Sequence, residues 1–261
     1  MDMAHRPAAS WFDSDLASGL RQGLLIGTAV LVLVLPPARP VLRPELAQQA
    51  TTTQTPLERR LELGGLVVSN DARLLAQWVI ASADNGDRRF AIVDKRNAQV
   101  LVFDANGRLA GAAPVLLGYA AGDDTVPGIG QRPIEQVKPE ERTTPAGRFV
   151  AEAGRNALNE DVVWVDYEAA VSMHRVRVTS PAERRLERLA SPTADDNRIS
   201  YGCINMPPSF FDTVIWPAFG QRRGIVYVLP EHKALEDVFP ALATTAVPPT
   251  PPSSSAPRPG S

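Results

Sequence analysis

The chain has only one cysteine, Cys203, among its 261 residues, which excludes an intramolecular disulfide. An unpaired thiol is either a buried inert group, an intermolecular link or a reactive nucleophile. An excess of positive charge is also lacking, because the formal net charge is −2 and the acidic and basic residues are interspersed. The chain therefore has no basic stripe of the kind that nucleic-acid binding needs, and we expect no nucleic-acid partner.

No apolar run reaches the roughly 20 residues of a comfortable membrane span. The longest run, 23–35 (GLLIGTAVLVLVL), follows Arg21 and ends at two prolines, which is typical of the apolar region of a signal peptide. We therefore expect residues 1–37 to be a signal peptide or an N-terminal membrane anchor, with a core helix as the remaining alternative. The protein is then exported to the periplasm or cell envelope and touches the membrane only through this segment.

Composition divides the rest of the chain into a linker, one ordinary domain and a tail. Residues 38–68 are rich in Pro, Gln, Thr and Arg and predict a linker, whereas the Pro/Ser-rich end predicts a disordered tail over 232–261. With 44% apolar residues, the segment between them can bury a core. We expect a helix over 69–87 that precedes a domain over 88–231.

The helix prediction depends on a cap and on spacing. Ser69 or Asn70 can cap the helix, and four apolar side chains then share one face at 3.6-residue spacing, namely Leu74, Leu75, Trp78 and Val79. Strand-like runs follow at 90–94, 99–103, 112–117, 148–151, 162–166, 170–178 and 224–229. The domain is therefore predicted to be mainly β with a few flanking helices.

Three other stretches interrupt the strands. Residues 118–147 lack periodicity, and long irregular segments of this kind usually border a functional site. Residues 181–190 (PAERRLERLA) are helical in composition and charged on most faces, which predicts a surface insertion. Residues 209–215 predict a further short helix after two prolines.

The neighbours of Cys203 favour a nucleophile. A thiol becomes reactive beside an imidazole, and His174, in a strand-like run, is the natural candidate, although a lone histidine in a strand is often structural. Gly202 permits a tight bend, so the amides of Gly202 and Cys203 are candidates for an oxyanion hole.

Smaller predictions concern the surrounding polar residues. Arg198 is suited to a substrate carboxylate, with a surface salt bridge as the alternative. The hydroxyl of Ser200 is expected to brace the turn rather than react. Asp123 and Asp124 are adjacent and point apart in an extended chain, so we do not expect them to act as a paired general acid and base.

At these residues the sequence resembles the L,D-transpeptidases with a YkuD-type catalytic domain. Their signature is an upstream histidine followed, after a spacer, by Ser/Thr-His-Gly-Cys, a hydrophobic residue and Asn or Arg. The matching residues are His174, Ser200, Gly202, Cys203, Ile204 and Asn205. The stretches IVDKRNAQVLVFD, GDDTVPGIG and ERTTPAGRF add to a resemblance that extends from about 88 to 230.

The resemblance implies a β-sandwich-like catalytic domain that acts on peptidoglycan stem peptides without a metal or organic cofactor. It implies that Cys203 is the nucleophile, that His174 is the base and that the backbone carbonyl of Arg175 orients the imidazole. Supporting or substrate-binding roles are expected for Arg175, Arg198, Ser200, Tyr201 and Asn205. The oligomeric state is not indicated.

Two departures from the family pattern leave alternatives open. Tyr201 stands where most members have histidine, and the spacer between His174 and Ser200 is longer than usual. The alternatives are a thiol L,D-carboxypeptidase that uses water as acceptor and a catalytically inactive module that binds the cell wall.

Overall fold

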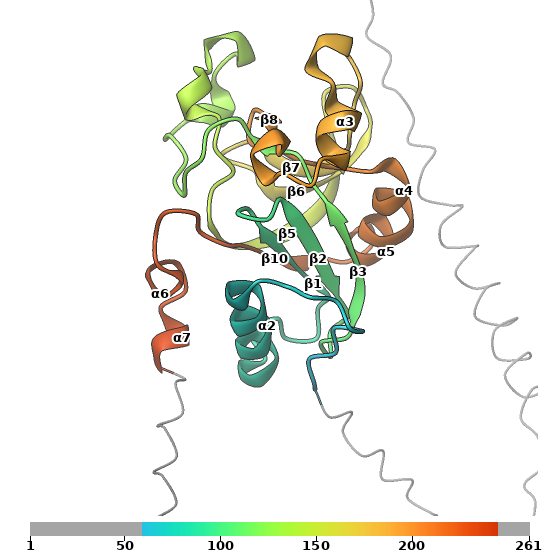
Figure 1. The fold of residues 1–261 in the computed structure, drawn as a ribbon, viewed down its shortest axis with the longest axis vertical. Helices are drawn as coiled ribbons and strands as arrows, with labels where there is room; N and C mark the ends of the chain where they lie inside the picture. The colour runs from blue at the N-terminus through green and yellow to red at the C-terminus, as the bar shows by residue number, and fades with distance from the viewer. Residues whose placement is uncertain (1–58, 245–261) are drawn as a thin grey trace, which may run out of the picture. The chain divides into compact units, whose positions relative to one another are not determined.

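The computed structural model describes residues 59–244, so the predicted signal peptide or anchor lies outside the described residues (Figure 1). The strands are β1 (Phe90–Asp94), β2 (Gln99–Phe103), β3 (Leu109–Pro114), β4 (Leu117–Gly118), β5 (Gly147–Arg155), β6 (Asp161–Asp166), β7 (Val171–Arg175), β8 (Arg198–Ser200), β9 (Ile204–Met206) and β10 (Gly224–Val228). Eight of them form one mixed sheet in the order β3-β2-β1-β10-β5-β6-β7-β9, and β4 pairs with β8. The protein is mainly β, as predicted.

The helical elements are short apart from the first. They are α2 (Asn70–Ser82), η1 (Ile129–Gln131), η2 (Ile134–Gln136), η3 (Pro139–Glu141), η4 (Pro181–Glu183), α3 (Arg185–Ala190), η5 (Ala194–Asn197), α4 (Pro208–Phe210), η6 (Phe211–Ile215), α5 (Trp216–Phe219), α6 (Leu235–Val238) and α7 (Ala241–Thr244). Within residues 59–244, no helix combines the length and apolarity that crossing a membrane requires.

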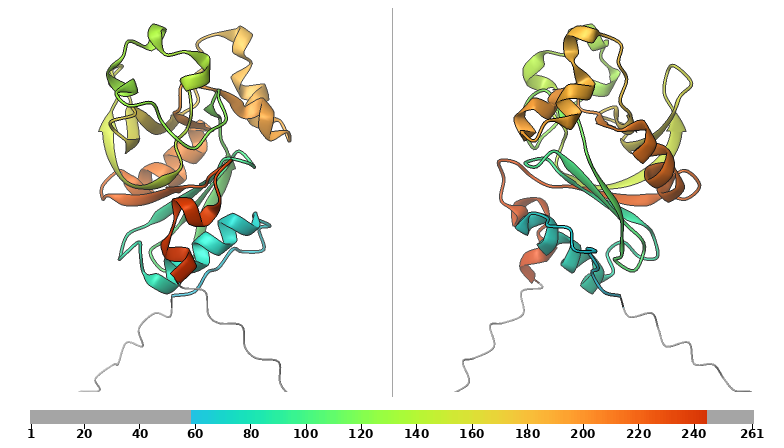
Figure 2. Two further views of the ribbon diagram at one scale, coloured as in Figure 1. Left: turned by 90° about the vertical axis from the view of Figure 1, so that its left-hand side faces the viewer. Right: turned by 45° about the vertical axis from the view of Figure 1, so that its right-hand side comes forward.

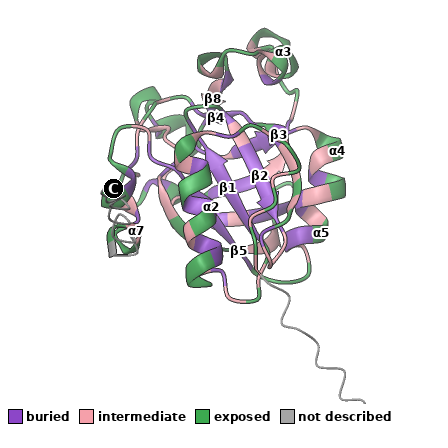
Figure 3. Cartoon of the chain, turned by 60° about the horizontal axis from the view of Figure 1, so that its bottom comes forward, coloured by how far each residue is buried: buried purple, intermediate pink, exposed green. Residues whose placement is uncertain are grey.

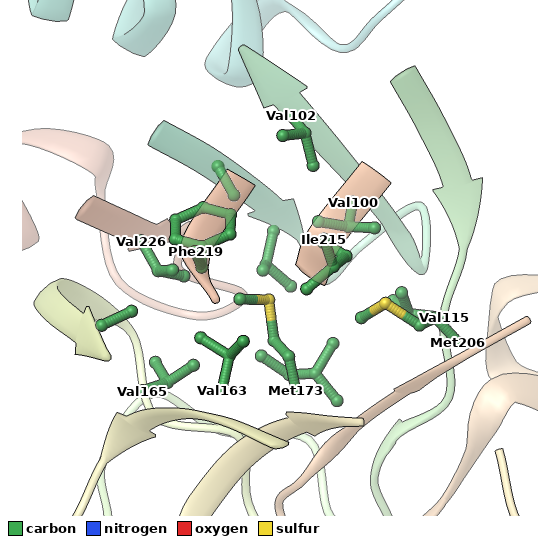
Figure 4. Close-up of a cluster of buried hydrophobic side chains, with 14 of the residues drawn as sticks. Val100, Val102, Val115, Val163, Val165, Met173, Met206, Ile215, Phe219 and Val226 are labelled. Carbon is green, nitrogen blue, oxygen red and sulfur yellow. The ribbon is translucent and has the colours of Figure 1, made fainter. Parts of the chain in front are cut away.

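The central strands β1 and β10 are parallel and buried on both faces. Because side chains alternate along a strand, Ala91 and Val93 enter one core while Phe90 and Ile92 enter another. In the first core the two halves of the sheet face each other across a layer of apolar side chains, as Figure 4 shows for Val100 and Val102 above Val163, Val165 and Met173. This arrangement gives the sheet its sandwich-like form.

The second core lies between the sheet and α2 (Figure 3). The hydroxyl of Ser69 caps α2 by accepting a hydrogen bond from the N–H of Ala72 at 3.1 Å. Leu75 and Val79 are fully buried, as predicted, but Leu74 is 51% exposed, because the buried face is completed by Ala72, Ala76 and Ile80. The prediction that Leu74 belongs to the buried face was wrong.

The structure differs from the prediction at both flanks of the domain. Part of the predicted linker packs against the second core through the half-buried Leu61, Leu63 and Leu66. Part of the predicted disordered tail forms α6 and α7, and Leu235 and Phe239 are buried in the same core. These few apolar side chains were not recognised as core residues because prolines and charged residues dominate the composition of both segments.

Several other elements also differ from the sequence prediction. The run 112–117 divides between β3 and β4, and the helix predicted over 209–215 extends across α4, η6 and α5. The strands β8 and β9 were not predicted, because three residues are too short for a periodic signal. The predicted insertion at 181–190 forms η4 and α3, and its Leu189 is buried against Leu116 and Val176.

Figures 1 and 2 show the two ends of the described domain. The helices α2, α6 and α7 lie at one end, and the segment 118–147 and α3 lie at the other. The strand β8 lies at the second end, close to α3 in Figure 1. Because Cys203 lies three residues after the end of β8, the candidate site belongs to this second end.

Candidate active site

Cys203 lies in a sharp turn between β8 and β9 and is half-buried. Gly202 adopts a φ of 125°, and a Cβ at this position would lie 2.7 Å from the carbonyl oxygen of Thr143. Only glycine avoids both the backbone strain and this clash. At Gly202 the backbone of the turn therefore packs closely against the 118–147 segment.

His174 lies in β7, which pairs with β9 in parallel so that His174 is in register with Asn205. Its Nδ1 is 2.8 Å from the carbonyl oxygen of Arg175, an arrangement in which Nδ1–H donates to this oxygen. The nitrogen left for Cys203 is then Nε2, and the imidazole and the thiol are close enough for each to shift the pKa of the other. The parallel pairing thus brings together two residues that are distant in sequence.

The electrostatics of this pair favour charge separation. Burial opposes the thiolate, but His174 and, to a smaller extent, Ser172 together outweigh burial and hold the pKa of Cys203 below its usual range. Burial likewise opposes the imidazolium, but Cys203 and the Arg175 carbonyl outweigh it and raise the pKa of His174. Each partner stabilises the charged form of the other.

Two further groups approach the sulfur. The hydroxyl of Ser172 lies 3.7 Å from Sγ, and the thiol lies 3.5 Å from the carbonyl oxygen of Ala170, a residue with positive φ. The backbone and side chain of Ser172 both contribute to the lowered pKa of Cys203. Sequence reasoning missed Ser172, although it lies two positions before His174 on the same strand and therefore on the same face.

The turn is braced by buried side chains on both sides. Ser200 donates from its hydroxyl to the carbonyl oxygen of Cys203 at 2.6 Å and accepts from the N–H of Gly202 at 3.1 Å. Asn205 donates from Nδ2 to the same carbonyl at 3.1 Å. Both residues therefore fix the backbone that carries the thiol.

The insertion predicted as a surface feature contributes to the site. Arg185, the first residue of α3, donates to Oδ1 of Asn205 at 2.9 Å. The positive charge of Arg185 also disfavours the imidazolium of His174, although less strongly than burial does. Sequence reasoning missed Arg185 because only the fold brings the insertion to β9.

A third missed residue, Thr144, joins the turn to Gly118 in the neighbouring strand β4. Its fully buried hydroxyl donates to the carbonyl oxygen of Gly202 at 2.8 Å and accepts from the N–H of Gly118 at 2.9 Å. The carbonyl oxygen of Thr144 accepts from Nζ of the buried Lys95 at 2.9 Å. The irregular segment 118–147 therefore holds the cysteine turn in place.

Tyr201 points outward from the turn and is 38% exposed. The guanidinium of Arg142 lies 3.9 Å from the centroid of its ring, which is the geometry of a cation–π contact. Arg142 itself donates to the carbonyl oxygen of Val137. Tyr201 thus packs against Arg142 at the surface of the turn.

The side chains of two arginines make contacts that differ from the predicted ones. Arg198 forms a largely buried ion pair with Glu231 rather than a salt bridge at the surface. Its guanidinium is therefore already paired with a carboxylate of the protein itself. The side chain of Arg175 points to Asp212 and lies over the ring of Phe211. Only the carbonyl of Arg175 supports His174.

One predicted oxyanion donor is already in use. The N–H of Gly202 donates to Ser200 within the turn, so it cannot also serve a bound oxyanion without breaking that bond. Within residues 59–244, the structure records no such bond from the N–H of Cys203. Cys203 therefore keeps the candidate role, and Gly202 contributes through its conformation.

Asp123 and Asp124 form no paired-carboxylate site. Asp123 is buried beside Lys95 at 3.0 Å and accepts three backbone N–H bonds from residues 231–233, whereas Asp124 pairs with Lys233 at the surface. Among the described residues, no three His, Cys, Asp or Glu side chains gather closely enough to hold a metal ion.

Comparison with known proteins found no matching family model and no matching curated protein. Among solved structures, the chain is similar to an L,D-transpeptidase from Enterococcus faecium at 19% identity, over 54% of this chain and 50% of that chain, with a TM-score of 0.30. An L,D-transpeptidase from Mycobacterium tuberculosis matches at 14% identity, over 55% and 58%, with a TM-score of 0.34.

The helical cell shape determining protein Pgp2 from Campylobacter jejuni matches at 11% identity, over 61% of this chain and 57% of that chain, with a TM-score of 0.38. The matched region thus spans between half and three fifths of these three chains. At these identities the likeness concerns the fold alone and assigns no role to individual residues.

Proposed function

We propose that the protein is a cysteine-dependent L,D-transpeptidase that acts on peptidoglycan stem peptides. The observation that carries the proposal is that Cys203, in the turn before β9, and His174, on the neighbouring strand β7, are close enough to lower the pKa of the thiol and raise that of the imidazole, while Nδ1 of His174 is held by the carbonyl oxygen of Arg175. The resemblance of the surrounding sequence to the YkuD-type signature supplies the substrate class. An inert buried thiol would have no partner that stabilises its thiolate.

In the proposed first step, the Cys203 thiolate attacks the carbonyl between diaminopimelate and the terminal D-Ala of a tetrapeptide donor. The imidazolium of His174 then protonates the leaving amine, and D-Ala departs as the thioester forms. In the second step, His174 accepts a proton from the amine of a second stem as this amine attacks the thioester. The products are a 3→3 crosslink and the free thiol.

The residues around the pair would serve this chemistry through position. The N–H of Cys203 would donate to the oxyanion of each tetrahedral intermediate, while Gly202, Ser200 and Asn205 hold the turn. The Arg175 carbonyl would keep the His174 tautomer that leaves Nε2 available. We assign this activity to a catalytic domain over 88–231 in an exported protein of the periplasm or cell envelope.

The test is incubation of the full chain with a purified disaccharide tetrapeptide, followed by mass spectrometry of the products. We expect release of D-Ala and a crosslinked dimer from the wild type, and neither product from Cys203→Ala. A matched control is His232→Ala, which changes an exposed histidine outside the site and should leave product formation unchanged.

Other outcomes separate the alternatives. Free tripeptide without dimer, at high acceptor concentration, would replace the transpeptidase with a thiol carboxypeptidase. D-Ala release that survives Cys203→Ala would remove the nucleophile from the proposal. A folded wild type that binds sacculi but forms no product would favour the inactive wall-binding module.

A further inference from the structure

A hollow of about 390 Å³ lies at the end of the sheet where β1 and β10 begin. Its lining includes Arg88, Arg89, Asn106, Pro217, Arg222 and Arg223, and we call it the arginine pocket. Because Phe90 is in register with Ile225, the two Arg-Arg pairs that precede these parallel strands come to the same edge.

The walls of the pocket are joined by side-chain hydrogen bonds. The fully buried Asn85 donates from Nδ2 to the carbonyl oxygens of Arg88, at 2.7 Å, and Ala105, at 3.1 Å. These bonds tie the segment before β1 to the turn between β2 and β3. The guanidinium of Arg89 donates to the carbonyl oxygen of Pro217, which ties the same segment to the last helix before β10.

The charge balance of the pocket favours an anion. Four arginines and two aspartates line the pocket, and Arg223 already forms an ion pair with Glu152 at 2.6 Å. The carboxylate of Asp104 is engaged by the backbone N–H groups of its own turn. Asp87 lies 3.8 Å from Arg222, and both side chains are more than four-fifths exposed, so this contact is weak. Within residues 59–244, neither Arg88 nor Arg89 has a carboxylate partner.

A third arginine pair lies where the described chain begins. The N–H of Arg60 donates to the carbonyl oxygen of Asn106 at 3.1 Å, and Arg59 donates to Oδ1 of Asn85. The chain therefore passes beside the pocket as it arrives from the segment that contains the apolar run 23–35. A membrane that held this run would therefore be tethered to the domain at the end where the pocket lies.

The thiol lies toward the other end of the sheet. Strand β1 leads from Arg89 at the pocket to Lys95, which bonds Thr144, the residue that holds Gly202. At about 3.3 Å per residue, this strand separates the two ends by roughly 20 Å. A surface bound at the pocket would leave the cysteine turn free.

We propose that the arginine pocket binds the phosphate headgroups of anionic phospholipids and holds the domain on the membrane surface with Cys203 facing away. Guanidinium groups match phosphate oxygens in a bidentate geometry, and several arginines near an anionic surface add their attraction. The volume of the pocket suits a headgroup. The proposal does not depend on the transpeptidase activity.

The test is hydrogen exchange of the full chain reconstituted in phosphatidylglycerol vesicles and in phosphatidylcholine vesicles. We expect amides of 86–90, 104–108 and 217–223 to be protected only with phosphatidylglycerol. The double variant Arg88→Gln/Arg89→Gln should reduce this protection by about fivefold per arginine. The matched control is Arg155→Gln/Arg177→Gln, which removes the same charge from exposed arginines outside the pocket.

A third arm uses inorganic pyrophosphate without vesicles. If pyrophosphate protected the same segments and phosphatidylglycerol did not, the ligand of the pocket would be a soluble phosphate compound, and the proposal that the pocket binds a membrane would be overturned. Equal protection in both vesicle types, or equal loss in the control variant, would also overturn the proposal. Unchanged exchange in the buried strands β1 and β10 serves as the check that each variant is folded.

Discussion

The most informative single residue is His174, because its effect on Cys203 can be measured without a substrate. Burial raises the pKa of the Cys203 thiol, but His174 and Ser172 together lower it by more, and His174 makes the larger contribution. As pH falls, the wild-type thiol therefore remains a thiolate to a lower pH than an ordinary cysteine does. Reactivity toward an alkylating reagent follows the thiolate fraction.

We predict that His174→Ala moves the pH profile of Cys203 alkylation to higher pH. Without His174 the pKa of the thiol rises. At pH values below the pKa, each unit of this rise lowers the thiolate fraction about tenfold, so the rate at pH 7 should fall by about tenfold or more. The measurement is the rate of iodoacetamide labelling by intact mass between pH 5 and 10. A profile that coincides with that of the wild type would contradict a thiol activated by His174.

Some residues of the site could be predicted from the sequence, and others are placed there only by contacts that are distant in sequence. Cys203 and His174 could be predicted because the chain offers one thiol and few imidazoles. Thr144 and Arg185 could not, because a threonine in an irregular segment and an arginine in a charged helix have no local signal. Their roles arise from contacts with residues that are far away in sequence.

At the scale of elements, the sequence predicted strands that carry their own pattern. The bounds of β1 and β2 match the prediction, because each is a continuous apolar run ended by a turn. The strands β8 and β9 have three residues each and form through parallel pairing with β4 and β7. Such pairing is decided by the whole fold, so the two strands that flank Cys203 were missed.

The contact between the 118–147 segment and the cysteine turn gives the next prediction. Thr144→Val keeps the shape of the side chain but leaves the N–H of Gly118 and the carbonyl of Gly202 without their buried partner. We expect a loss of about 1–3 kcal/mol in the free energy of unfolding. Slower alkylation of Cys203 at pH 7 should accompany it, because the turn is no longer held.

Thr213→Val provides the control for this change. The Thr213 hydroxyl donates to the carbonyl oxygen of Ser209 on an exposed helical surface, where water can replace it. We expect urea denaturation to show a change of about 0.5 kcal/mol or less for this variant. Equal losses for the two threonine variants would show that the buried bonds of Thr144 contribute nothing specific.

For the whole molecule, the decisive feature is a buried ion pair that joins segments distant in sequence. Nζ of Lys95 lies 3.0 Å from Oδ1 of Asp123, and Asp123 also accepts the N–H groups of residues 231–233. Burial lowers the pKa of Lys95 to about 8, so the ammonium is still charged at pH 7. The pair connects the end of β1, the 118–147 segment and the chain after β10.

The two adjacent aspartates offer a direct comparison of buried and exposed ion pairs. We predict that Lys95→Met lowers the free energy of unfolding by about 3–5 kcal/mol, because it leaves the Asp123 charge buried without its cation. Lys233→Met removes the exposed partner of Asp124 and should cost about 1 kcal/mol or less. Urea denaturation of both variants at pH 7 measures the difference. Similar losses would mean that water reaches Asp123 as freely as Asp124, and the cysteine turn would then be held by its local bonds rather than by this pair.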